Sequence, residues 1–245
     1  MQRKTVIKRV LIAIQARSNS TRLPDKGREL IDGKTVTDHV LDACRSAANT
    51  INRSTGNSQT TVEIALLVPF GDPLRDAHSG RDFVFQGSEK DVLTRYHTCW
   101  DILKRPEYIV RITGDCPMIP SWLIPRFIQL GTAKEYDYFS NVHEGLRTSP
   151  DGWDCEFMSS QMLEWLHENA DTDYDREHVT TLARKKPYPT WARRAVNLGH
   201  MDLSHIKCSV DTPEDLTSVR QHFAKLKDIS IRAIQEYGFK SVHRF

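Results

Sequence analysis

Short apolar runs alternate with amphipathic segments along most of the chain. The uninterrupted apolar runs are typical of strands that are buried on both faces of a sheet. We expect strands at 10–14, 62–69, 83–86, 108–113, 137–141, 154–158 and 207–211. Strands that alternate with helices predict an α/β fold with a Rossmann-like, mostly parallel sheet covered on both faces.

The segments between these runs carry apolar residues at helical spacing. Val36, Val40, Leu41 and Cys44 recur in this way, and Ser88 is expected to cap a later helix. We expect helices at 35–48, 88–104, 121–133, 160–169, 174–186, 213–225 and 229–237. The polar stretch 49–61 predicts a surface loop.

The chain shows no internal repeat, low-complexity tract or long linker. We therefore expect residues 1–245 to form a single domain. The run 137–158 interrupts the alternation of strands and helices, which predicts a strand-rich insertion over the carboxyl edge of the sheet.

Composition narrows the possible partners and compartment. The 34 basic and 32 acidic residues give a formal charge of +2, which argues against a general nucleic-acid binder. The 5 cysteines include no C-x-x-C pair and favour reduced thiols in a cytoplasm, with Cys116 and Cys155 in the core. No apolar run approaches the roughly 20 residues of a membrane span, so we expect no membrane partner.

The first predicted strand ends in a loop rich in cations and hydroxyl groups. Arg17, Ser20, Arg22 and Lys26 suit a polyphosphate ligand. Residues 15–27 contain a single glycine, Gly27, so the loop has neither the Walker P-loop motif nor the dinucleotide-binding motif. Charged side chains, rather than backbone amides, are therefore expected to bind the phosphates.

Two carboxylates stand at the ends of distant strands. Asp115 and Asp211 each follow an apolar run, and neither has an obvious local cation. Because both would repel a phosphate, we expect a Mg²⁺ ion between them and the ligand. Asp211 also fits the N-cap of the helix that starts at Pro213, and the two roles are compatible.

A second group of polar residues is expected to bind the other substrate. Asp151, Asp154 and Glu156 predict recognition of acceptor hydroxyls or a second metal, and an exposed strand edge is the alternative. Arg176 either binds an acidic acceptor or pairs with a neighbour. For His178 a structural role is favoured over that of a general base.

Six motifs, in order over about residues 9–225, carry a family resemblance. They are ARSNSTRLPDK (16–26), GSEKDVLTRY (87–96), VRITGDCPMI (110–119), PDGWDCE (150–156), REHVT (176–180) and VDTPEDL (210–216). The chain resembles the cytidylyltransferase family, and within it the SpsF-like branch of spore coat polysaccharide biosynthesis. Asp25 departs from the family pattern, in which glycine is common at this position. VPFGD (68–72) stands where the family usually has an A-T-S/T-type segment after the second strand.

The resemblance implies a nucleotide-diphospho-sugar transferase fold and a Mg²⁺-dependent reaction of CTP with an acceptor. CMP would pass to the acceptor and pyrophosphate would leave. By this resemblance Arg17, Arg22, Lys26 and Asp115 are catalytic, and Asp115 and Asp211 bind the metal. The residues expected to contact the nucleotide are Gln15, Ala16, Arg17, Ser20, Arg22, Lys26, Pro69, Ser88, Asp91 and Arg95.

Several points stay open from the sequence. The acceptor is a sugar, a sugar acid or another small phosphorylated or carboxylated metabolite for polysaccharide or glycoconjugate synthesis. The alternatives are a glycosyltransferase that uses a nucleotide sugar, a nucleotidyltransferase for another base, and a non-catalytic nucleotide-binding protein. Because related enzymes often pair, a homodimer is also possible.

Overall fold

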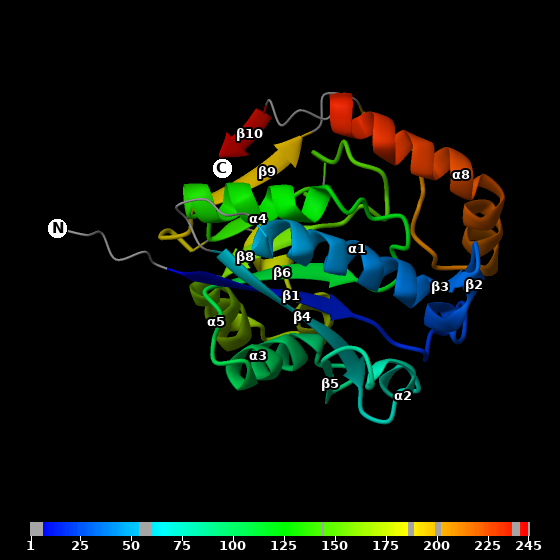
Figure 1. Ribbon diagram of the computed structural model, residues 1–245. Coiled ribbons are helices and arrows are strands. Elements are labelled where there is room, and N and C mark those ends of the chain that lie inside the picture. Colours follow the sequence, from blue (N-terminus) through cyan, green and yellow to red (C-terminus); the bar gives the residue numbers. More distant parts are fainter. Residues whose placement is uncertain are drawn as a thin grey trace.

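The computed structural model describes residues 7–53, 60–143, 145–185, 189–198, 202–236 and 241–244, and its core is an eight-stranded sheet between two layers of helices (Figure 1). Across the sheet the order is β10-β9-β7-β8-β6-β1-β4-β5. The strands are β1 (Lys8–Gln15), β4 (Thr60–Pro69), β5 (Val84–Gly87), β6 (Tyr108–Thr113), β7 (Tyr138–Ser140), β8 (Glu156–Ser159), β9 (Arg194–Leu198) and β10 (Ser241–Arg244). β8 and β10 run antiparallel to their neighbours, while the other pairings are parallel, which confirms the mostly parallel α/β fold.

Helices and a small hairpin complete the described chain. The helices are η1 (Lys26–Arg28), α1 (Val36–Asn52), α2 (Leu74–His78), α3 (Val92–Ile102), α4 (Leu123–Lys134), α5 (Ser160–Asn169), α6 (Asp173–His178), α7 (Thr181–Arg184) and α8 (Pro213–Glu236). The hairpin consists of β2 (Leu30–Ile31) and β3 (Lys34–Thr35). In the described part of the chain, no helix is long and apolar enough to cross a bilayer.

Alternation along β1 places side chains in both helical layers. Val10, Ile12 and Ile14 pack in the same cluster as α1, α4 and α8, whereas Leu11 and Ala13 pack with α3 and α5. All five side chains are fully buried, as expected for a central parallel strand. Figure 1 shows α1, α4 and α8 on one side of the sheet and α3 and α5 on the other.

One predicted strand was wrong. Residues 207–211 form no strand, and the segment makes only an isolated bridge between Asp151 and Lys207. Its N–H groups bind loops instead, as when Cys208 N–H donates to the carbonyl of Asp151 over 2.6 Å. The apolar character of the segment reflects the burial of Cys208 and Val210 in the core rather than strand pairing.

Several helix predictions had the wrong boundaries, and the helix expected at 35–48 extends to Asn52. α3 begins after Asp91, which caps the helix because its side chain accepts from Thr94 N–H. The Ser88 hydroxyl instead accepts from Asp91 N–H, so Ser88 is not the cap of this helix. The predicted helix 174–186 is broken at Val179, where φ is 60°. The helix expected at 229–237 is the continuation of α8 to Glu236, and residue 237 lies outside the described residues, as do 54–59 of the predicted loop 49–61.

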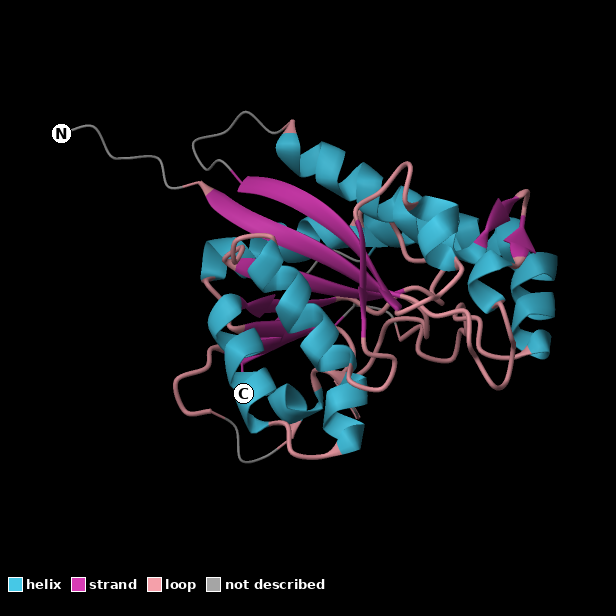
Figure 2. Cartoon of the chain, turned by 90° about the horizontal axis from the view of Figure 1, so that it is seen from below, coloured by secondary structure: helices cyan, strands magenta, loops and turns pink. Residues whose placement is uncertain are grey.

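The two strands of the expected insertion at 137–158 belong to the main sheet. β8 lies between β6 and β7, so both strands extend the sheet instead of covering its carboxyl edge. The connection from β7 to β8 carries Asp151 and Asp154 towards the pocket described below. In Figure 2, loops gather beyond the strand ends that lie away from the N-terminus.

Candidate active site

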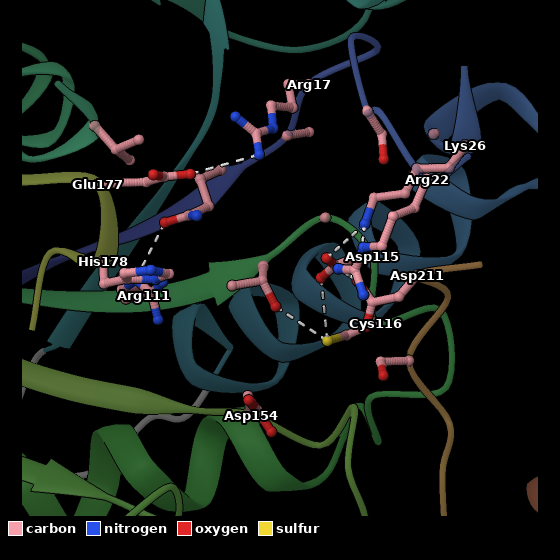
Figure 3. A pocket seen from close by; sticks show the side chains of 18 of the residues that line it. Arg17, Arg22, Lys26, Arg111, Asp115, Cys116, Asp154, Glu177, His178 and Asp211 are labelled. Carbon is pink, nitrogen blue, oxygen red and sulfur yellow. Dashed lines mark hydrogen bonds and ion pairs between the residues drawn. The ribbon is translucent and has the colours of Figure 1, made fainter. Parts of the chain in front are cut away.

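A pocket of about 340 Å³ lies at the carboxyl ends of β1 and β6 (Figure 3). This volume is in the range typical of small-molecule sites. It is lined by segments that are far apart in the chain, including the loop after β1, the turn after β6, α6 and the segment before α8. The expected site residues that line it are Gln15, Ala16, Arg17, Ser20, Arg22, Lys26, Arg95, Asp115, Asp151, Asp154, His178 and Asp211.

The loop after β1 is held in shape by a buried aspartate from the loop after β4. Ser18 N–H donates to Oδ2 of Asp72 over 2.7 Å, and the Ser18 hydroxyl donates to Oδ1 over 2.8 Å. Asp25 closes the loop through its N–H to the carbonyl of Ser18. Asp25 has a φ of 56°, a conformation that glycine adopts more easily, which explains why glycine suits this position.

Gly27 allows the close packing that positions the preceding residue, Lys26. A Cβ atom at Gly27 would lie 2.8 Å from Oγ1 of Thr37 and 3.2 Å from Cδ1 of Leu74. The short helix η1 therefore packs against α1 and α2 only because this position has no side chain. This packing fixes the backbone of Lys26, whose side chain enters the pocket.

Lys26 lies between the two strand-end aspartates. Its Nζ is 2.9 Å from Oδ2 of Asp115 and 3.3 Å from Oδ1 of Asp211, and Nη2 of Arg22 is 3.0 Å from the same Asp211 oxygen (Figure 3). These two cations are not local to the aspartates in sequence but come from the loop after β1. Arg22 and Lys26, which the sequence assigned to the phosphates, contact the aspartates directly.

These contacts oppose the effect of burial on both groups. Burial alone would lower the pKa of Lys26, but the charges and hydrogen bonds of Asp115 and Asp211 raise it above its ordinary value. Burial would raise the pKa of Asp115, yet the Lys26 charge and hydrogen bond hold it below its usual range. Both groups are therefore charged at neutral pH.

Backbone contacts place Asp115 and Asp211 side by side. Gly114 N–H donates to the carbonyl of Gln15 over 2.7 Å, and a Cβ atom at Gly114 would lie 2.7 Å from the Cβ of Ala16. Val210 N–H donates to the carbonyl of Asp115 over 2.8 Å. The turn after β6 is thus tied to both the first loop and the segment that carries Asp211.

Asp211 is not the residue that caps α8. The Thr212 hydroxyl accepts from Asp215 N–H over 3.2 Å, and the Asp215 carboxylate accepts from the N–H groups of Asp211 and Thr212. This reciprocal arrangement completes the helix start. The Asp211 carboxylate therefore stays in the pocket.

The carboxylate pair fits a divalent ion that also binds a phosphate. Mg²⁺ is usually held by one or two protein carboxylates together with water and substrate phosphate oxygens. Asp115 and Asp211 supply two such groups around one cationic position. Among the described residues, no three His, Cys, Asp or Glu side chains form a metal cluster, so these two would need phosphate or water to complete the coordination.

Arg111 anchors the other side of the pocket through a buried network. Its guanidinium donates to the buried carboxylate of Glu156 and, over 3.1 Å, to Oε1 of Gln15, while the Tyr138 hydroxyl also donates to Glu156. Burial would raise the pKa of Glu156, but the charge of Arg111 lowers it. Glu156 does not line the pocket, and its carboxylate serves this network. A charged residue inside the apolar run YIVRIT could have indicated a site at Arg111.

Asp151 and Asp154 form an acidic wall that the sequence had grouped with Glu156. Arg147 forms an ion pair with Asp154 and lies 3.6 Å from Asp151. Burial raises the pKa of Asp154 to about 6, although the charge of Arg147 opposes the rise. Ser209, a pocket residue that was not predicted from the sequence, donates its hydroxyl to Asp151 over 3.1 Å.

α6 contributes an ion pair across the pocket mouth. Nη2 of Arg17 lies 3.5 Å from Oε1 of Glu177, a pocket residue not predicted from the sequence. His178 also lines the pocket, and burial lowers the pKa of its imidazole, which is therefore neutral at pH 7. Arg176 does not line the pocket and instead pairs with Asp91 over 3.0 Å. Of the two roles considered for Arg176, the structure shows the ion pair with another residue of the chain.

Arg95 is a buried cation in the pocket wall. The residue is 2% exposed, and its Nη1 donates to the carbonyl of Leu67 over 3.4 Å. Burial lowers the pKa of its guanidinium, and among the described residues no carboxylate forms an ion pair with it. The remaining expected nucleotide contacts, Pro69, Ser88 and Asp91, do not line the pocket.

The sequence profile described as "Cytidylyltransferase" matches residues 11–242. The chain belongs to the cytidylyltransferase family. Among curated relatives of this cytidylyltransferase, the spore coat polysaccharide biosynthesis protein SpsF of Bacillus subtilis is 27% identical over 88% of the chain and 87% of that protein. An uncharacterized protein of Methanocaldococcus jannaschii is 30% identical, and the match spans 63% of this chain and 62% of that protein, less than two thirds of its length.

Solved structures confirm the nucleotide-diphospho-sugar transferase fold. A cytidylyltransferase from Leptospira borgpetersenii superposes with a TM-score of 0.75 at 22% identity, covering 96% of this chain and 99% of that one. A CMP:2-keto-3-deoxy-manno-octonic acid synthetase complexed with CTP gives 0.59 at 16% identity, covering 89% and 99%.

Proposed function

We propose that this cytidylyltransferase transfers CMP from CTP to a small acceptor and releases pyrophosphate. The observation that carries the proposal is the meeting of Lys26 and Arg22 with Asp115 and Asp211 in one pocket. Cations that can bind phosphates and carboxylates that can bind a divalent ion are the groups that nucleotidyl transfer requires. Membership of the cytidylyltransferase family supports CTP as the nucleotide.

The reaction is an in-line displacement at the α-phosphorus. An acceptor oxygen forms a bond to phosphorus, the bond to the bridging oxygen breaks, and pyrophosphate leaves with the electron pair of that bond. Arg22 and Lys26 would stabilise the negative charge that grows on the leaving group. Arg17 lies at the pocket mouth, and its exposed guanidinium can exchange Glu177 for a phosphate oxygen.

Asp115 and Asp211 would hold Mg²⁺ in this proposal. The bound ion supplies charge neutralisation and polarisation of the phosphate. The protein contributes the rigid placement of the two carboxylates through the Gly114 and Val210 backbone hydrogen bonds.

The acceptor is expected to lie against Asp151 and Asp154. Both side chains line the pocket and can accept hydrogen bonds from hydroxyl groups. Asp154 can also take the proton that an attacking hydroxyl loses. The relative SpsF carries a polysaccharide name, which supports a sugar-derived acceptor.

The test is pyrophosphate release from each of the four nucleoside triphosphates with a panel of sugars, sugar acids and phosphorylated acceptors. We expect release with CTP, dependence on one acceptor class, and loss of release with a chelator. Equal release with all four nucleotides would contradict the cytidylyl specificity. Undiminished release under chelation would contradict the role of Mg²⁺.

A further inference from the structure

The ammonium group of Lys26 occupies the position that a cation bound by Asp115 and Asp211 would take. It contacts one oxygen of each carboxylate, over 2.9 Å and 3.3 Å, and its side chain is only 13% exposed. The charges of the two aspartates are therefore already partly balanced by a residue of the chain itself.

We propose that Lys26 is an internal counter-ion of this carboxylate pair. A divalent cation then binds there strongly only when a nucleoside triphosphate draws the ammonium group away. The inference rests on the proposed function, since it takes the two aspartates as the metal ligands and phosphate as the second partner of Lys26. It goes further by making metal binding depend on nucleotide binding.

Electrostatics supports this competition. An ammonium group and a divalent ion between the same two carboxylates would repel each other at short range in a partly buried site. Arg22 adds to the barrier because its Nη2 lies 3.0 Å from the Asp211 oxygen that Lys26 contacts. Lys207 lies 3.5 Å from the other Asp211 oxygen. A metal ion alone must therefore displace cations without offering them another anion.

A triphosphate can provide that other anion without a large backbone movement. Gly27 packs η1 tightly against its neighbours, so the backbone of Lys26 is fixed. The four-carbon stem of a lysine side chain still allows its ammonium group to turn to a new partner. The Arg22 side chain is 64% exposed and is free to follow the phosphates.

This exchange couples the two ligands thermodynamically. If nucleotide binding removes the competing ammonium group, it raises the affinity for the metal ion. The metal ion must then raise the affinity for the nucleotide by the same factor. Couplings of this kind are commonly about 5- to 150-fold.

The decisive measurement is Mn²⁺ binding in the absence of nucleotide, followed by the EPR signal of free Mn²⁺. We expect Lys26→Met to bind Mn²⁺ about tenfold or more tightly than the wild type, within the usual range of such couplings. Lys34→Met is the matched control, because Lys34 pairs with Asp42 over 2.6 Å outside the pocket. It should bind Mn²⁺ as the wild type does. Equal affinity of the wild type and Lys26→Met would overturn the inference.

A second measurement needs no variant. Crystals of the wild-type protein are soaked in Mn²⁺ with and without CTP, and the anomalous signal between Asp115 and Asp211 is compared. We expect strong signal only with CTP, and equal signal in both soaks would overturn the inference. Failure of CTP to bind would instead contradict the proposed function, while the comparison of Mn²⁺ affinities without nucleotide would still decide whether Lys26 competes with the metal.

Discussion

The backbone N–H of Val210 donates to the carbonyl oxygen of Asp115 over 2.8 Å and ties the segment before α8 to the end of β6. The hydrogen bond is made by main-chain atoms, so it holds together the backbone segments that carry the two carboxylates of the site, whatever their side chains contact. Lys26 reaches the same point from the tightly packed helix η1. The centre of the pocket is therefore set by backbone geometry, and variants of single side chains should test function without dismantling it.

Lys26→Met is expected to lower kcat by about 10²- to 10³-fold, as loss of one preorganised electrostatic stabiliser typically does. Pyrophosphate release with saturating CTP measures the effect. Lys34→Met removes a comparable lysine–aspartate pair outside the pocket and should leave kcat unchanged. An active Lys26→Met enzyme would show that the leaving group is stabilised elsewhere.

Asp115→Asn should change the response of stability to acid. The pKa of Asp115 is held below its usual value by Lys26, against the effect of burial. The ionised carboxylate therefore contributes stability that is present above its unfolded pKa of about 3.9 and is lost as the pH falls through the lower folded pKa. The melting temperatures of the wild type and the variant should converge as the pH falls from 7 to below the folded pKa of Asp115. A gap that stays constant over this range would contradict the assignment.

Glu156→Gln is expected to destabilise the protein by about 3–5 kcal/mol, because it leaves the buried guanidinium of Arg111 uncompensated. Urea unfolding monitored by circular dichroism measures the change. Glu164→Gln removes one of two exposed partners of Arg105, for which about 0–1 kcal/mol is expected. Normal stability of Glu156→Gln together with a raised KM for the acceptor would instead support direct acceptor binding by Glu156.

Asp154 should give the acid limb of the pH–rate profile. Its pKa is raised to about 6 by burial, so its carboxylate becomes protonated as the pH falls through that value. If ionised Asp154 accepts a hydrogen bond or proton from the acceptor, kcat/KM should fall below about pH 6. The limb should be absent in Asp154→Asn and unchanged in Asp76→Asn, whose carboxylate is largely exposed. A limb that persists in Asp154→Asn must come from another group.

Gly152→Ala is expected to destabilise the chain and to disturb the pocket. Gly152 has a φ of 100°, and an added Cβ atom would lie 2.5 Å from the backbone nitrogen of Ser209. The strain and overlap together should cost about 1–3 kcal/mol. Gly80→Ala is the matched control, because no atom lies within 4 Å of its added Cβ. Thermal melting of both variants gives the comparison, and equal melting temperatures would contradict the close contact.

The central strands and the cationic loop were predictable because their patterns are local. The apolar run 10–14 lies within β1, and the run 62–69 lies within β4. Arg17 to Lys26 follow a strand end, where open α/β sheets bind ligands, and residues of this loop line a pocket in the structure. The failure at 207–211 has a physical cause. Burial makes a segment apolar whether it pairs as a strand or, as here, binds the 151–152 turn.

Pairwise contacts could not be read in the same way. The sequence grouped Glu156 with Asp151 and Asp154, but strand β8 carries its carboxylate into the Arg111 network. The contacts of Lys26 with Asp115 and Asp211 join segments whose distance depends on the whole sheet. Such partners become visible only when register and crossovers are known.

The distance in sequence between Lys26 and Asp211 has a consequence for biosynthesis. In a chain of 245 residues, the early cations leave the ribosome long before the second carboxylate is translated. A nascent polypeptide that stops before residue 211 contains Arg22 and Lys26 but only one of the two carboxylates that Lys26 contacts. Under the proposed function, such a truncated product would lack one of the two carboxylates expected to hold the metal ion.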